Sequence, residues 1–138
     1  MKKASNIGRI LAAAAVFAGS AAVFLVAYFN PVTAGFFPVC PLYSMTGLHC
    51  PGCGLTRGFH ALFHGDILSA LHFNAFVPVY FLLFAYLGIS LFLIAARGRG
   101  LPLKITRPSL AYGFLALLLV FGVVRNLPYY PFTFLAPQ

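Results

Sequence analysis

The sequence contains almost no acidic residues. Asp66 is the single Asp or Glu among 138 residues, and charged residues make up only 7% of the chain. Soluble globular proteins carry roughly 25% charged residues, so an ordinary soluble domain is excluded. One carboxylate cannot form the acid–base pair that many hydrolases use, and the chain has no Ser-His-Asp arrangement or glycine-rich phosphate loop. We therefore expect a non-enzymatic protein.

Apolar residues dominate what is present. They make up 62% of the chain, and the mean hydropathy is +0.96. Because a helix rises about 1.5 Å per residue, roughly 20 apolar residues cross a hydrocarbon core of about 30 Å. The sequence predicts an all-α integral membrane protein, a single membrane domain over 1–138. Its three transmembrane helices are expected at about 10–29, 76–96 and 109–127. The first run also resembles a cleaved signal peptide, but it is too long for one.

The basic residues predict the orientation of these helices. The net charge is +8, and seven bases fall on one side of a three-span arrangement: Lys2, Lys3, Arg9, Arg97, Arg99, Lys104 and Arg107. The positive-inside rule puts that side, with the N-terminus and the basic loop 97–108, in the cytoplasm. The C-terminus is then extracytoplasmic. These bases favour lipid headgroups as partners rather than nucleic acid, because no basic face with interleaved aromatics lies outside the membrane.

All three cysteines lie between the first two runs, on the predicted extracytoplasmic side. Cys50-Pro51-Gly52-Cys53 has the form of a metal knuckle, in which proline and glycine turn the backbone so that N–H groups point at the sulfurs. Cys40 supplies a third thiolate. A tetrahedral ion such as zinc takes a fourth ligand, and His60 or His64 shares a helical stripe with Cys53. The predicted ligands are thus Cys40, Cys50, Cys53, His60 and His64.

The same cysteines allow other chemistry. Cys40 would tend to form a disulfide with Cys50 or Cys53 in an oxidising compartment. The C-x-x-C spacing is also that of dithiol redox centres. Cysteine-based transfer would combine Cys53 with His60 or His64. The sequence leaves metal binding, a disulfide and redox activity open.

An amphipathic stretch follows the knuckle. In residues 55–73, apolar and polar side chains alternate at helical spacing, which predicts an interfacial helix. The cysteine turn and this helix together occupy 38–75. Gly65-Asp66 interrupts the pattern, and Asp66 is expected to cap a following helix turn. As the only acid, Asp66 should also find a basic partner. We predict an ion pair with Arg57 or Arg125 that joins the turn to the third helix.

One extended motif runs through the cysteine turn and the helix that follows it. It consists of Cys40-Pro41, Thr46-Gly47, Cys50-Pro51-Gly52-Cys53-Gly54 and Thr56-Arg57, followed by Gly65-Asp66, Ala70 and Asn74. Over about residues 38–75 it resembles a family of small bacterial membrane proteins known as domain of unknown function 2752. This chain has Gly58 where alanine often follows, and Ala75 where proline often stands. The resemblance implies several membrane helices in a bacterial cytoplasmic membrane, with no established activity.

These observations lead to two functional hypotheses. The first is a small accessory or scaffold component of the inner membrane, whose extracytoplasmic turn is clamped by a metal ion or a disulfide and whose exposed face meets another membrane protein. The alternative is a membrane thiol-redox or metal-handling protein that uses Cys50 and Cys53.

Overall fold

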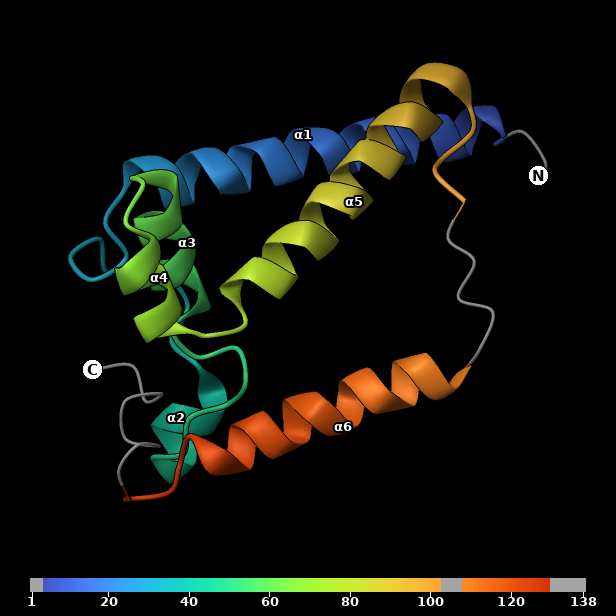
Figure 1. Ribbon diagram of the computed structural model, residues 1–138. Helices are drawn as coiled ribbons and strands as arrows, with labels where there is room; N and C mark the ends of the chain where they lie inside the picture. The colour runs from blue at the N-terminus through green and yellow to red at the C-terminus, as the bar shows by residue number, and fades with distance from the viewer. Residues whose placement is uncertain (1–3, 103–107, 130–138) are drawn as a thin grey trace.

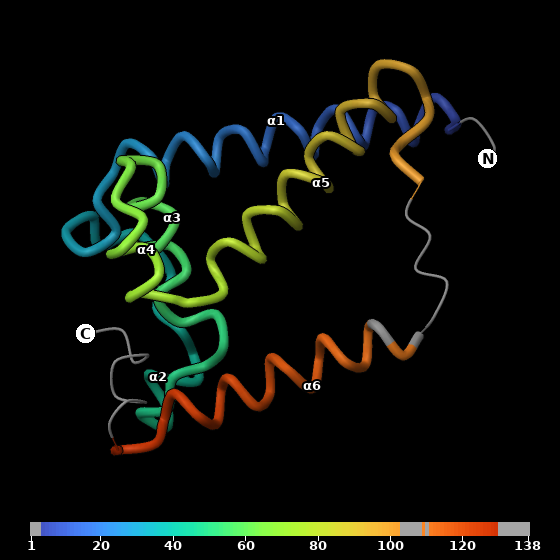
Figure 2. The backbone as a smooth tube through the Cα atoms, viewed as in Figure 1, coloured from blue at the N-terminus to red at the C-terminus, as the bar shows by residue number. Residues whose placement is uncertain are grey.

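The computed structural model describes residues 4–102 and 108–129, and within these ranges the regular secondary structure is α-helix throughout, joined by turns and loops (Figures 1 and 2). The helices are α1 (Asn6–Tyr28), α2 (Pro41–Thr46), α3 (Leu55–Phe63), α4 (Ile67–Phe73), α5 (Val77–Arg97) and α6 (Pro108–Val124). The predicted all-α fold is therefore confirmed. Lys2, Lys3, Lys104 and Arg107, on which part of the orientation rests, lie outside the described residues.

Two helices are long and apolar enough to cross a membrane. They are α1, with 23 residues, and α5, with 21 residues. The prediction of three such helices is thus confirmed for two. The third apolar helix, α6, has 17 residues and ends at Val124, three residues before the expected end. Beyond Val124 the α-helix gives way to a tighter turn, in which the backbone N–H groups of Asn126 and Leu127 donate to carbonyls three residues back.

The N-terminal end of α1 lies beside the C-terminal end of α5 (Figure 1). α1 begins four residues earlier than predicted because the Ser5 side chain accepts a hydrogen bond from the Gly8 backbone N–H, at 3.2 Å. This start brings Arg9 into the helix. Its Nε and Nη2 donate to the carbonyls of Ala95 and Ala96, each at 3.2 Å. The last carbonyls of a helix have no partner within it, so Arg9 closes the end of α5.

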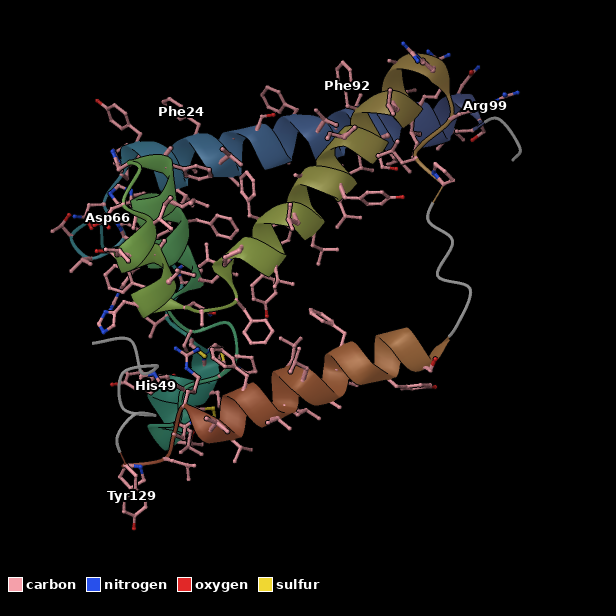
Figure 3. All side chains as sticks on the ribbon, viewed as in Figure 1. Phe24, His49, Asp66, Phe92, Arg99 and Tyr129 are labelled. Carbon is pink, nitrogen blue, oxygen red and sulfur yellow. The ribbon has the colours of Figure 1, made fainter. Side chains whose placement is uncertain are left out.

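Basic and cysteine-containing parts of the chain lie at opposite ends of α1 and α5. Figure 3 shows Arg99 at the end where α1 begins, and His49 and Asp66 toward the other end. α6 approaches the rest of the fold at its own C-terminal end, beside α2 (Figure 2). The cysteine turn therefore lies where α2, the start of α5 and the end of α6 meet.

The predicted interfacial helix consists of two helices. α3 and α4 are separated at Gly65, whose φ of +81° requires a residue without a side chain. Asp66 then caps α4, because its Oδ1 accepts a hydrogen bond from the Ser69 backbone N–H at 3.0 Å. The predicted break and the predicted cap are both confirmed.

A small core forms where α3, α4 and α5 meet. It contains Ala61, Ala70 and Val77. Gly58 allows this approach, since a Cβ atom there would lie 2.5 Å from Val77 Cγ2 and 3.2 Å from the Ala70 carbonyl oxygen. Gly58 therefore has a packing role in this chain.

Gly58→Ala is expected to destabilise the fold by about 1–3 kcal/mol, the usual cost of overpacking. The new methyl group would meet Val77, whose β-branched side chain rotates little. Thermal unfolding in detergent would measure the loss. Gly88→Ala is the matched control, because it gains the same helix propensity and a Cβ there meets nothing within 4 Å. Adding Val77→Ala to Gly58→Ala should recover stability. Equal midpoints for the two glycine variants would contradict this packing.

Candidate metal centre

A short helix brings Cys40 back to the knuckle. The sequence predicts a turn here, whereas the structure has α2, which Cys40 precedes as the N-cap and Pro41 opens. Proline suits the first position of a helix, and Gly47 ends α2 with a φ of +71°. The Pro41 and Gly47 pair was the signal for this helix. Its consequence is that Cys40 and Cys50, ten residues apart, come side by side.

The three sulfur atoms form one cluster. Cys50 Sγ lies 3.3 Å from Cys40 Sγ and 3.3 Å from Cys53 Sγ, and all three lie within 4.8 Å of one another. A disulfide would need about 2.05 Å, and the three cysteines are free. Around a tetrahedral zinc ion with Zn–S bonds of about 2.3 Å, sulfur atoms stand about 3.8 Å apart. The spacing of the cluster is compatible with ligands that share one ion.

The backbone of the knuckle turns as predicted. The N–H group of Cys50 donates to Cys53 Sγ at 3.2 Å, and the N–H group of Cys53 donates to the Cys50 carbonyl at 3.0 Å. Gly54 follows with a φ of +79° and opens α3. An amide directed at a sulfur favours the thiolate, which is the form that binds metals.

Cys40 and Cys53 have very different acidities. The Cys40 side chain forms no capping hydrogen bond, yet the backbone N–H of Tyr43 favours its thiolate and lowers the pKa of Cys40 to about 7. Cys53 is buried, and burial raises its pKa to about 12. In the metal-free protein, Cys40 is thus the more reactive of these two thiols at neutral pH.

Two buried polar side chains hold the carbonyl groups of the knuckle. Arg125, 1% exposed, donates from Nη1 to the carbonyls of Cys50 and Cys53, at 3.0 and 3.1 Å. Asn74 is fully buried and donates from Nδ2 to the carbonyls of Pro51 and Cys53, at 2.9 and 3.2 Å. These bonds fix the knuckle without using a sulfur atom.

Asn126 joins the end of α6 to the residue before the knuckle. Its Oδ1 accepts from the His49 N–H and its Nδ2 donates to the His49 carbonyl, both at 2.8 Å. Gly122 allows the contact, because a Cβ there would lie 3.1 Å from Pro51 Cγ. Asn126 is not among the residues that the sequence predicts for the site, and Asn74 enters there only through the family resemblance. The available signal was an amide bordering an apolar run, since a buried amide must find hydrogen-bond partners.

The histidines predicted as ligands contact α1. His60 Nδ1 lies 2.7 Å from the Val26 carbonyl oxygen, and His64 Nε2 lies 3.1 Å from that of Ala27. A carbonyl only accepts, so both nitrogens act as donors and close the C-terminal end of α1. Among the described residues, the group of side chains that could share an ion consists of the three cysteines. Metal ligation by His60 or His64 stays a prediction.

Asp66 and Arg125 have separate partners. Asp66 is exposed, and hydrogen bonding by Ser69 at the start of α4 lowers the pKa of its carboxyl. Arg125 is buried against the knuckle. The expected ion pair between them is therefore not formed in the described part of the chain, because each group finds a nearer backbone partner. Arg125 does join the turn to α6, but through carbonyl groups. A pairing of Asp66 with Arg57, in the first turn of α3, stays a prediction.

Comparison with known proteins supports the importance of this region. Residues 40–88 match the family described as Protein of unknown function (DUF2752), which confirms the resemblance seen in the sequence. The match spans the three cysteines, α2, α3, α4 and the first half of α5, while Arg125 and Asn126 lie outside it. No curated protein and no solved structure matches the chain.

Asn74→Ala should leave the Pro51 carbonyl without its side-chain donor and loosen the knuckle. Loss of a hydrogen bond to this half-buried acceptor costs about 0.5–1.5 kcal/mol. Alkylation with iodoacetamide, followed by mass spectrometry, should show faster modification of Cys53. Cys40 is the internal control, because its sulfur contacts Cys50 Sγ, whereas Asn74 contacts the carbonyls of Pro51 and Cys53. Unchanged protection of Cys53 in a folded variant would contradict the role of Asn74.

The pH dependence of alkylation should separate the cysteines of the metal-free protein. Because the Cys40 pKa is lowered to about 7, its rate should reach half of its maximum near pH 7. The Cys53 pKa is raised to about 12, so Cys53 should react slowly up to pH 10. Rates measured at each cysteine by mass spectrometry would test this, and coincident pH profiles for Cys40 and Cys53 would contradict it.

Proposed function

We propose that this chain is an integral membrane protein whose three cysteines form a thiolate metal centre, and that it acts as a non-enzymatic accessory component. The observation that carries the proposal is the cluster of three sulfur atoms within 4.8 Å of one another. It is strengthened by Arg125 and Asn74, which hold the knuckle from its carbonyl side.

Membrane embedding is supported by the surfaces of α1 and α5. Their large apolar side chains are mostly exposed, among them Phe24 at 62% and Phe92 at 59% (Figure 3). An apolar surface of this extent requires lipid or protein around it. At about 1.5 Å per residue, α6 is about 26 Å long, and we include it as the third span.

The orientation follows from the bases at one end of the fold. Arg9, Arg97 and Arg99 lie where α1 begins and α5 ends. The positive-inside rule favours the cytoplasm at that end, and so an extracytoplasmic knuckle, in a bacterial inner membrane.

Zinc is the metal that best fits the proposal. Thiolates suit zinc and monovalent copper, and zinc takes tetrahedral sites with sulfur ligands. Cys40, Cys50 and Cys53 would hold the ion, which would link the segment before α2 to the knuckle. Three protein ligands leave a fourth position open. A group from another membrane protein could complete it, which connects the metal centre to an accessory or scaffold role.

A thiol-redox protein is the second candidate, favoured by the unequal acidities of the cysteines. Cys40 is readily ionised and its Sγ lies 3.3 Å from Cys50 Sγ. The Cys40 thiolate would attack a disulfide of a partner protein and form a mixed disulfide, releasing one partner thiolate. The Cys50 thiolate would then attack the Cys40 sulfur and displace the second partner thiolate. Cys40 and Cys50 end oxidised, and the partner ends reduced.

Metal analysis combined with thiol alkylation would decide between these functions. The metal centre predicts about one zinc ion per chain and three thiols that become reactive only after chelation. Each of Cys40→Ser, Cys50→Ser and Cys53→Ser should then lose most of the zinc, while Met45→Ala, exposed on α2, should keep it. Absence of stoichiometric metal, together with two thiols blocked as a disulfide, would refute the metal centre and favour the redox protein.

A further inference from the structure

Arg125 is a buried cation with unused donors. Its side chain is 1% exposed, and its guanidinium lies 5.0 Å from the centre of the Phe121 ring. Nη1 contacts the two knuckle carbonyls, whereas Nε and Nη2 have no hydrogen-bond partner within the described residues. A buried charge is costly unless an opposite charge lies near it. An anion beside this guanidinium would therefore stabilise the fold.

No carboxylate side chain can supply that anion. Asp66 is the only acidic residue in the sequence, and it is exposed and occupied at the start of α4. Arg125 interacts electrostatically with the ionisable groups of Cys50, Cys53 and Tyr80. A tyrosine phenol is neutral at pH 7. The cysteine sulfurs are thus the groups suited to balance Arg125.

The charge of the cysteine cluster depends on what it binds. Three protonated thiols are neutral, and so is a disulfide with one protonated thiol, so both leave the buried guanidinium unbalanced. A Cys40 thiolate in the metal-free protein adds a partial negative charge to the cluster, but the charges that act on Arg125 are those of Cys50, Cys53 and Tyr80. Three thiolates around a divalent ion carry one net negative charge, which Arg125 neutralises. Three thiolates around monovalent copper carry two, and three thiolates around trivalent arsenic carry none.

We infer that Arg125 is the counter-charge of the three-cysteine centre, a residue that sets metal affinity without being a ligand. The inference rests on the proposed metal centre. Its consequence is that the contribution of Arg125 to affinity grows with the negative charge that the bound centre acquires. A purely structural role, holding the knuckle carbonyls, would affect every ion alike.

Three probes separate charge from structure. Trivalent arsenic, added as arsenite, exchanges its three hydroxides for three cysteine sulfurs, with release of three waters and no change of oxidation state. Binding of arsenite, Zn²⁺ and Cu⁺ to the full chain in lipid nanodiscs would be measured by competition with calibrated chelators or thiols. The variants are Arg125→Gln, Arg125→Lys, and Asn126→Ala, which removes hydrogen bonds to His49 but no charge.

Arg125→Gln should bind arsenite with nearly the affinity of the wild type. Its affinity for zinc should fall about 10–100-fold, the range typical of groups that act through metal ligands. Its affinity for copper should fall further still. Arg125→Lys should retain most of the zinc affinity, because it keeps the charge. Asn126→Ala should change the three affinities by similar factors.

Two outcomes would overturn the inference. Equal losses of all three ions in Arg125→Gln, arsenite included, would mean that Arg125 only shapes the knuckle. Unchanged zinc and copper affinities would mean that its charge does not reach the centre. Failure of the wild type itself to bind these ions would refute the proposed metal centre, and is distinguishable because it appears before any substitution.

Discussion

The contact between the Arg125 guanidinium and the carbonyls of Cys50 and Cys53 fixes where α6 meets the rest of the fold. Apolar helices in an apolar environment can slide past one another, because one apolar contact is much like the next. A buried guanidinium removes that freedom, since it is stable only where acceptors surround it. It fixes the end of α6 at the knuckle, and Asn126 adds two hydrogen bonds at the same place.

The same kind of interaction closes two other helix ends. Arg9 donates to the last carbonyls of α5, and His60 donates to the Val26 carbonyl near the end of α1. In a chain with one carboxylate, bases have few anionic partners, whereas every helix ends in unpaired carbonyls. This explains why the expected ion pair between Asp66 and Arg125 gives way to backbone contacts.

Local pattern predicted much of the fold and part of the site. The lengths of the apolar runs predicted the bounds of α1 and α5 to within a few residues. The spacing of the knuckle predicted that Cys50 and Cys53 lie close together. The partners of His60 and Arg125 were not predictable in this way. Helical spacing shows which residues share a face but not which carbonyl that face meets, because this depends on how distant helices pack. The short helix α2 was not predicted, because six residues are too few to show a helical period in hydropathy.

The knuckle is held by its backbone, and this bears on how the centre would work. In small zinc domains, metal binding and folding are a single event. Here Asn74 and Arg125 fix the carbonyl groups through bonds that involve no sulfur atom, and the sulfurs already lie close together. Loss of an ion would then leave these carbonyl bonds in place but remove the negative charge that balances Arg125. A centre with three ligands, an open fourth position and carbonyl bonds that involve no sulfur atom is suited to exchange of a fourth ligand from a neighbouring protein.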